Sequence, residues 1–202
     1  MITPIHDHSY EKAFTIVHHT LTFCLQKKKE ATMAEKIDKI REEWKKNRID
    51  FFVGSTPQPF SAKTMNSHQF NSKDYNGKNL LIFIYGKKSL ERDHNLSYNM
   101  TDDLNRLFTE YKDQTGFIGI LEGLEDDKTV YEKALKDAGN IQFEQIDNTK
   151  SPQRQEQIKY NIFCTPARIL INSNGKVIHS SCGGATDQEL IRKLDSIKTQ
   201  QK

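Results

Sequence analysis

Residues 160–178 decide the fold of this chain, and they read Tyr-Asn-Ile-Phe-Cys-Thr-Pro-Ala-Arg-Ile-Leu-Ile-Asn-Ser-Asn-Gly-Lys-Val-Ile. Two apolar runs, 167–172 and 176–180, flank the dipeptide Asn174-Gly175. Asn-Gly between apolar runs is a strong signal of a tight turn, because both residues tolerate a positive φ angle. The stretch therefore predicts a hairpin of two apolar strands.

Upstream of the hairpin, apolar strands alternate with amphipathic helices. Residues 80–85 form a continuous apolar run, typical of a strand covered on both faces in a mostly parallel sheet. The remaining expected elements are strands at 117–121 and 141–146 and helices at 101–111, 126–138, 152–160 and 186–197. Thr186 is expected to cap the last helix, with Glu189 completing a capping box. This order predicts an α/β sandwich in which right-handed crossovers place helices on both faces of a mixed sheet.

The N-terminal quarter has a different character. Residues 1–50 are mostly charged and carry two narrow apolar stripes at helical spacing, which predicts a helical segment, either a hairpin or the stump of an upstream domain. Residues 51–78 start with a Gly- and Pro-rich stretch that excludes helix, and they are expected to form an extended connector with a short strand pair. The expected α/β core occupies residues 79–198.

Composition excludes several classes of function. The 202 residues contain 30 Lys+Arg against 27 Asp+Glu, and the resulting net charge of +3 is too small and dispersed for a nucleic-acid-binding surface. The longest apolar run, residues 80–85, is far shorter than the ~20 residues of a membrane span. The start shows no secretory signal, so the chain as written is expected in the cytoplasm, or in the bacterial periplasm or cell envelope if its start is truncated or processed.

The three cysteines, Cys24, Cys164 and Cys182, are an odd number without the short spacings of a zinc site or a disulfide framework. Cys164 lies about ten residues before the hairpin turn and Cys182 about seven after it, an offset on the order of 10 Å in extended strands. A disulfide needs Cα atoms within about 7 Å, so no disulfide is predicted. The seven histidines lack metal-ligand spacing, and neither a metal nor a cofactor is expected.

Three segments occur in an order that resembles a known family. They are an entry segment with glycine, prolines and an aromatic residue at 53–60, the block at 72–83 in which Asn-Gly-Lys precedes the apolar strand, and the block at 160–178. Together they resemble the thioredoxin-like superfamily, specifically thiol-disulfide oxidoreductases of the TlpA/ResA type, which border on the AhpC/TSA-related peroxiredoxins. The resemblance covers residues 52–198. It implies a thioredoxin-like sandwich in which a cis peptide bond precedes Pro166.

The sequence departs from this family at the site that carries the family's chemistry. Family members have a Cys-x-x-Cys motif after the first core strand, where a helix N-terminus lowers the pKa of the first thiol. By position, Lys88 and Glu91 stand where the two cysteines would lie, and neither side chain can exchange disulfides. The resemblance therefore implies a degenerate redox site without a catalytic residue at these positions.

The segment Cys164-Thr165-Pro166 remains as the candidate binding site. In the family, the cis-proline loop offers main-chain groups to an extended peptide, and this capacity does not depend on cysteine. Cys164 is the one thiol expected near this face. The expected partner is therefore a protein or an extended peptide, and the sequence predicts no oligomeric state.

Two functions are compatible with these residues. In the first, the domain has lost its redox chemistry and acts as a binding or structural module through the cis-proline loop and the N-terminal helices. In the second, it is an atypical thiol-disulfide oxidoreductase or antioxidant protein that works through a single thiol, Cys164. Replacing Cys164 by Ser discriminates between them, because it should be silent in the first case and abolish activity in the second.

Overall fold

The structure is a computed structural model, which describes residues 26–27, 29–30, 32–43, 46, 48–86, 100–123, 136, 140–149, 156–162, 164–183 and 187–200. The chain forms two compact units, residues 1–47 and 48–202. In the first unit, residues 32–43 are helical and exposed, as the sequence predicts for this segment. Among the described residues, none of the helices combines the length and the hydrophobicity of a membrane span.

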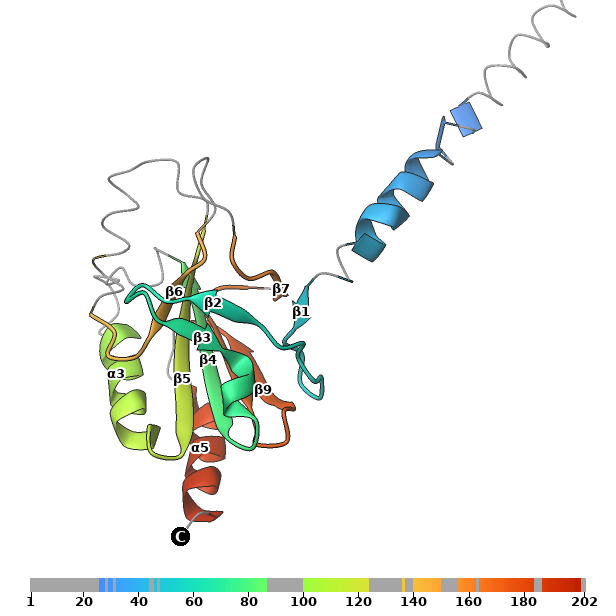
Figure 1. Cartoon of the computed structure of the whole chain (residues 1–202). Coiled ribbons are helices and arrows are strands. Elements are labelled where there is room, and N and C mark those ends of the chain that lie inside the picture. The colour runs from blue at the N-terminus through green and yellow to red at the C-terminus, as the bar shows by residue number, and fades with distance from the viewer. Residues whose placement is uncertain are drawn as a thin grey trace, which may run out of the picture. The chain divides into compact units, whose positions relative to one another are not determined.

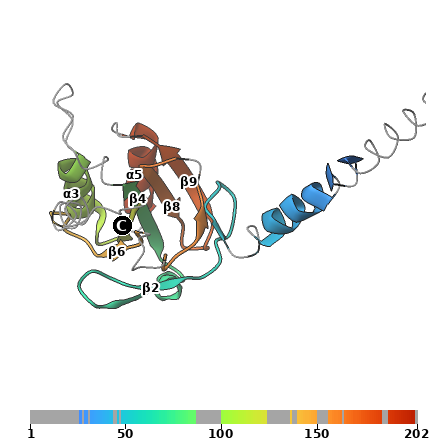
Figure 2. The ribbon, with the colours of Figure 1, turned by 90° about the horizontal axis from the view of Figure 1, so that it is seen from above.

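A five-stranded mixed sheet forms the centre of the second unit (Figures 1 and 2). Its strand order is β6-β5-β4-β8-β9, in which β4, β5 and β6 are parallel, and β8 is antiparallel to both β4 and β9. The elements of the sheet and its helices are β4 (Asn79–Gly86), α3 (Met100–Tyr111), β5 (Thr115–Glu122), β6 (Gln145–Asp147), β8 (Ala167–Ile171), β9 (Val177–Cys182) and α5 (Gln188–Gln200). The predicted α/β sheet and its C-terminal hairpin are confirmed.

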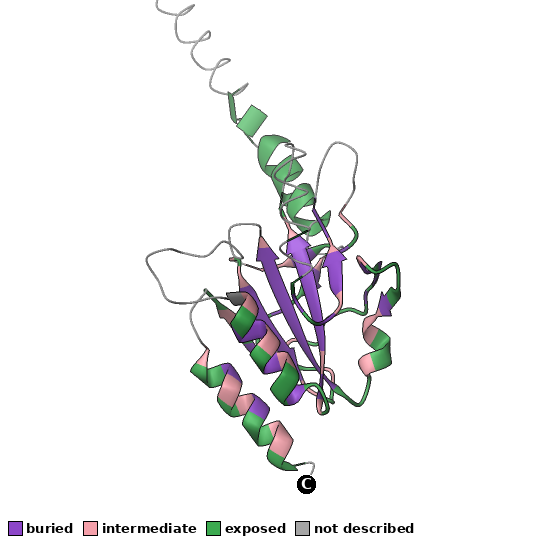
Figure 3. Ribbon diagram, turned by 90° about the vertical axis from the view of Figure 1, so that its left-hand side faces the viewer, coloured by how far each residue is buried: buried purple, intermediate pink, exposed green. Residues whose placement is uncertain are grey.

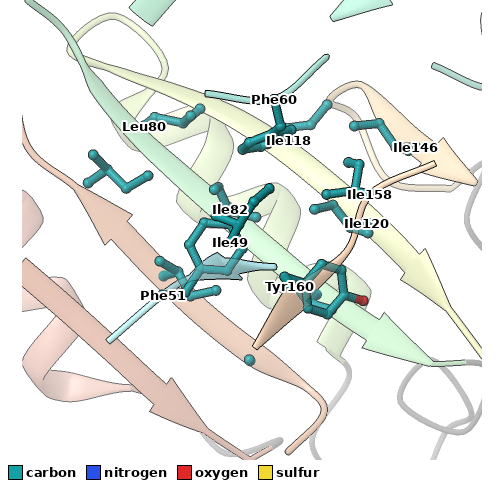
Figure 4. Close-up of a cluster of buried hydrophobic side chains, with 14 of the residues drawn as sticks. Ile49, Phe51, Phe60, Leu80, Ile82, Ile118, Ile120, Ile146, Ile158 and Tyr160 are labelled. Atoms are coloured by element: carbon teal, nitrogen blue, oxygen red, sulfur yellow. The ribbon is translucent and has the colours of Figure 1, made fainter. Parts of the chain in front are cut away.

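Alternate residues of β4 enter two separate hydrophobic cores, because both faces of the sheet are covered. The odd-numbered residues from Leu81 to Tyr85 pack with α3 and α5 on one face. Figure 3 shows these two helices beside the buried strands. The even-numbered residues from Leu80 to Ile84 pack on the other face against side chains from small strands rather than from helices (Figure 4).

Two small sheets supply this second core. They are the parallel pair β1 (Ile49–Asp50) and β7 (Tyr160–Asn161), and the antiparallel pair β2 (Ser61–Lys63) and β3 (Gln69–Asn71), which is followed by the short 3₁₀ helix η1 (Ser72–Tyr75). The β2–β3 pair confirms the strand pair that the sequence predicts before residue 79.

The β1–β7 pair corrects the prediction that residues 49–50 and 160 are helical. The side chains of Ile49 and Tyr160 are buried in the second core, and the N–H of Ile49 donates to the carbonyl of Lys159 over 2.9 Å. Burial against distant residues therefore overrides the local helical spacing.

The cap of the last helix lies one residue later than predicted. The carboxylate of Asp187 accepts a hydrogen bond from the N–H of Leu190 over 3.0 Å, so Asp187 caps α5. Thr186, the predicted cap, lies outside the described residues. The helix expected at 126–138 also lies outside them, except for Lys136, which is helical.

Candidate functional site at the cis-proline loop

The cis-proline loop lies where β8 begins, beside the end of β4. The peptide bond between Thr165 and Pro166 is cis, as the resemblance implied. The antiparallel pairing of β8 with β4 places Ala167 opposite Ile84. The loop therefore lies at the end of the sheet where the C-terminus of β4 is located. Lys88 and Glu91 lie outside the described residues, so their predicted positions beside this loop remain predictions.

Cys164 and Cys182 form a disulfide, with their Cα atoms 6.0 Å apart. The prediction that these cysteines could not pair is therefore wrong. In the register of β8 and β9, Cys182 lies opposite Ala167. Ala167 is three residues from Cys164, which is the offset expected from counting residues on each side of the hairpin turn. The count assumed that the strand continues straight back to Cys164, whereas residues 164–166 form a bend that returns Cys164 toward β9.

Gly183 holds the β9 side of this loop through both of its main-chain groups. Its N–H donates to the carbonyl of Pro166 over 3.0 Å, which extends the pairing of β8 and β9 by one residue pair. Its carbonyl accepts a hydrogen bond from Nη1 of Arg168 over 2.7 Å. Its φ of 111° lies in the region that favours glycine. Gly183, which follows Cys182, is thus held in place by Arg168 of β8 and by Pro166, the residue before β8.

Arg168 anchors this end of the sheet from the inside. The side chain is buried, its guanidinium lies 5.6 Å from the centre of the Phe83 ring, and Nη2 lies 3.8 Å from a carboxylate oxygen of Asp103. Asp103 belongs to the first turn of α3 and also accepts a hydrogen bond from Arg106 over 2.7 Å. A buried charge needs such pairing to offset its loss of hydration. Arg168 therefore links α3 to the end of β9 beside the disulfide.

Asp187 fixes β9 on the helix-covered face. Its carboxylate accepts a hydrogen bond from the hydroxyl of Ser181 and lies 2.7 Å from Nε2 of His179. Burial acts to raise the pKa of Asp187, but hydrogen bonds from Ser181, the Leu190 N–H and His179 outweigh it and hold the pKa below its ordinary value. The first turn of α5 is thus joined to the residue that precedes Cys182.

The two cysteine residues of the disulfide differ in exposure. Cys182 and Thr165 are exposed, whereas Cys164 and Pro166 are half-buried. A disulfide on the surface can be reached by an external thiolate, which a buried one cannot. The geometry therefore permits exchange with a thiol that approaches from the β9 side.

The structure brings together the predicted residues Cys164, Thr165 and Pro166 and adds Cys182 and Arg168 to them. The sequence does not predict Cys182 at this site, because extended strands would keep it too far from Cys164, and the bend at residues 164–166 shortens that distance. Arg168 carried a signal of its own, because a charged residue inside an apolar strand must find a partner when it is buried.

Known proteins share this architecture. Over 148 residues, which are 72% of this chain and 78% of the relative, the sequence is 28% identical to the thiol-disulfide oxidoreductase ResA of Geobacillus kaustophilus (strain HTA426). The structure is similar to a thiol-disulfide oxidoreductase from Bacteroides fragilis NCTC 9343, with a TM-score of 0.51, 20% identity, and coverage of 71% of this chain and 99% of the other. No protein-family model matches the chain.

These comparisons agree with the geometry. The parallel first half of the sheet, the antiparallel closing hairpin and the cis bond before Pro166 are those that the sequence implied. The structural likeness supports the fold, and the ResA similarity covers a similar share of the chain. The chain has a thioredoxin-like fold, and its sequence is similar to that of a thiol-disulfide oxidoreductase of the TlpA/ResA type.

Proposed function

We propose that this protein is a thiol-disulfide oxidoreductase whose redox-active pair is Cys164 and Cys182. The observation that carries the proposal is the disulfide between them, placed directly beside the cis bond of Thr165-Pro166. The name of the similar ResA protein supports the same chemistry. The proposal keeps the reaction of the second sequence hypothesis and replaces its single thiol with a pair.

The first sequence hypothesis, a module without redox chemistry, rested on an intact scaffold and cis-proline site that lack the Cys-x-x-Cys pair. The chain contains no Cys-x-x-Cys motif, but the disulfide supplies two sulfurs at the cis-proline loop. The premise of a lost cysteine pair is therefore not supported. The loop at Thr165-Pro166 keeps its proposed role of offering main-chain groups to a client.

Exchange begins at Cys182, the more exposed residue of the pair. A thiolate of a client dithiol attacks Sγ of Cys182, which forms a mixed disulfide and releases Cys164 as a thiolate that takes up a proton. The second client thiolate then attacks the client's own sulfur in the mixed disulfide, and Cys182 leaves with the electron pair. The client gains a disulfide and this protein is reduced to two thiols. The reverse steps reduce a client disulfide.

The first test is to equilibrate the oxidised protein with mixtures of reduced and oxidised glutathione, and to count alkylated thiols by mass spectrometry. Cys164 and Cys182 should become alkylated together in one transition, while the protein stays folded. Insulin disulfide reduction coupled to dithiothreitol then measures catalysis.

In that assay, Cys164→Ser and Cys182→Ser should each abolish the rate above the uncatalysed background. Cys24→Ser is the matched control and should keep the wild-type rate. A pair that is reduced only when the protein unfolds, or a rate that survives both serine variants, contradicts the proposal.

A further inference from the structure

We infer that the outer side of β9, at Ser180 and Cys182, binds an extended peptide of the client protein by strand addition. This inference rests on the proposed function, because it names the substrate class and the docking surface of the same cysteine pair. β9 is the last strand in the order of the sheet. Its inner side pairs with β8, and within the described residues no strand pairs with its outer side.

The register of β8 and β9 shows which main-chain groups point outward. The N–H of Gly183 donates to Pro166, so these two residues form a hydrogen-bonded pair. Along an antiparallel ladder, such pairs alternate with pairs that exchange no hydrogen bonds. Cys182 and Ser180 precede Gly183 by one and three residues and fall into the second kind. Their N–H and carbonyl groups therefore point away from β8, and we call these groups the open edge.

The open edge lacks the charged and proline residues that commonly protect an edge strand. Residues 178–182 read Ile-His-Ser-Ser-Cys, without Lys, Arg, Asp, Glu or Pro. The side chains of Ser180 and Cys182 are exposed. For the part of the chain that the structure describes, no main-chain hydrogen bond reaches the open edge. Such an edge is a template for another strand.

The same side of β9 already pairs with main-chain groups of the turn at Gly54 and Ser55. Val177 donates to the carbonyl of Ser55 over 2.9 Å and accepts from the N–H of Gly54 over 2.8 Å. A second polypeptide that runs alongside β9 can therefore reach the outer side of this strand. A client peptide bound at Ser180 and Cys182 continues the main-chain pairing of this side of β9 beyond Val177, and the outward N–H and carbonyl groups of a strand are matched by an extended backbone.

Strand addition brings a client sulfur close to the disulfide. Residues directly opposite each other on neighbouring strands lie on the same face, with Cβ atoms about 4.5–5.5 Å apart. A disulfide joins Cβ atoms about 3.5–4.5 Å apart, so a client cysteine opposite Cys182 needs only a small shift to attack it. The open edge therefore selects clients that present cysteine in an extended segment, not in a helix or a packed core.

The test measures binding without exchange. The oxidised protein is titrated into a fluorescein-labelled peptide of alternating Thr and Val, with Ser in place of a central Cys, and fluorescence anisotropy is recorded. N-methylation of one set of alternate residues should weaken binding by about fivefold or more, and methylation of the other set should not, because only every second N–H donates to β9. Absence of binding, or equal sensitivity of both sets, overturns the inference.

A variant of the protein locates the bound peptide. Ser180→Pro removes the outward N–H of Ser180 and leaves the N–H groups that donate to β8, so peptide affinity should fall by about fivefold or more. Ser180→Ala keeps the N–H and is the matched control, and thermal melts of both variants monitor folding. Binding that is as tight in Ser180→Pro as in the wild type would place the peptide elsewhere, for example on the cis-proline loop, and overturn the inference.

Glutathione separates this inference from the proposed function, because it is too small to require a strand-binding surface. If glutathione reduces the Cys164–Cys182 pair but the peptide does not bind, the inference of peptide binding at the open edge is overturned and the redox proposal stands. If the peptide binds with the alternating pattern but glutathione does not reduce the pair in the folded protein, the redox proposal fails and the open edge stands.

Discussion

The two edges of the central sheet, β6 and β9, are completed in different ways (Figure 2). On the β6 side, the carbonyl of Gln145 accepts from the N–H of Met65 over 2.7 Å, and the carbonyl of Asp147 accepts from Nε2 of Gln157 over 3.0 Å. Among the described residues of β9, only Val177 has main-chain partners on the side that faces away from β8. Among the described residues, the β6 edge is therefore paired with other groups of the chain, whereas the β9 edge beyond Val177 has no main-chain partner beside the disulfide.

The difference extends to the side chains behind each edge. Behind β6, the Tyr85 hydroxyl donates to Oε1 of Gln145 over 2.8 Å, and Gln145 donates to the carbonyl of Phe143 over 2.7 Å. Burial raises the pKa of Tyr85, so its hydroxyl stays neutral and remains a donor. Behind β9 lie the charged groups of Arg168 and Asp187. The contacts of Gln145 behind β6 therefore join neutral groups, whereas the contacts behind β9 involve charged groups, and the β9 side also carries the redox-sensitive cysteines.

The largest effect is expected from Gly119→Ala, which tests how tightly the β6 side is packed. Gly119 lies opposite Gln145, and an added Cβ would overlap the side-chain oxygen of Gln145 and lie 2.7 Å from its Nε2. Gln145 can move only by losing its bonds to Tyr85 and Phe143, which leaves a buried hydroxyl without its acceptor. We expect a loss of about 3 kcal/mol in the free energy of unfolding, measured by urea denaturation.

Gly175→Ala is the matched control for this substitution. Gly175 lies in the hairpin turn with no atom within 4 Å of an added Cβ, but its φ is 74°. The left-handed backbone alone should cost about 1 kcal/mol. Equal losses for the two variants would show that the β6 side is not held by the contact between Gly119 and Gln145.

An intermediate effect is expected from removing the disulfide, which tests the β9 side. The bridge joins residues 18 positions apart, and a loop of about this length restrains the unfolded chain by roughly 3 kcal/mol. The hairpin already keeps Cys164 and Cys182 near each other, so we expect the double variant Cys164→Ser/Cys182→Ser to lose about 2 kcal/mol. Urea denaturation of oxidised, reduced and double-variant protein provides the measurement. Equal stability of the oxidised and reduced forms would show that the bridge does not restrain this side.

The sheet could be predicted where periodicity and burial coincide. The apolar run at 80–85, the turn at Asn174-Gly175 and the amphipathic helix near 101–111 all became elements of the structure. The strands β1 and β7 could not be predicted, because two residues show no period. They form because Ile49 and Tyr160, far apart in the sequence, are buried in the same core.

The site could be predicted only as far as local sequence and resemblance reach. The cis bond before Pro166 came from a sequence block, and the structure confirms it. The disulfide was missed because the reach of Cys164 depends on a three-residue bend, which a count of extended residues cannot include. The bonds of Arg168 to Gly183 and toward Asp103 join three elements, and no spacing along the sequence encodes them.

The smallest effect is expected from Asp187→Asn, and its dependence on pH tests whether charge holds the β9 side. The pKa of Asp187 is lower in the folded protein than its ordinary 3.8, so the carboxylate stabilises the fold above that value, and this contribution is lost as the pH falls through the folded pKa. Asn keeps a capping oxygen but loses the charge that faces His179 and the start of α5, and the expected loss is about 1 kcal/mol near neutral pH.

The cost of the same substitution should shrink as the pH falls from neutral through the folded pKa of Asp187, because the wild-type carboxyl then becomes neutral as well. Urea denaturation of both proteins across this range measures the difference, and Asp113→Asn, at an exposed aspartate, is the matched control. If the loss from Asp187→Asn is the same at both ends of the range, the carboxylate acts only as a neutral acceptor. Asp187 would then hold β9 through neutral hydrogen bonds, as Gln145 does behind β6, and the charge of Arg168 would remain as the ionic contact of the β9 side.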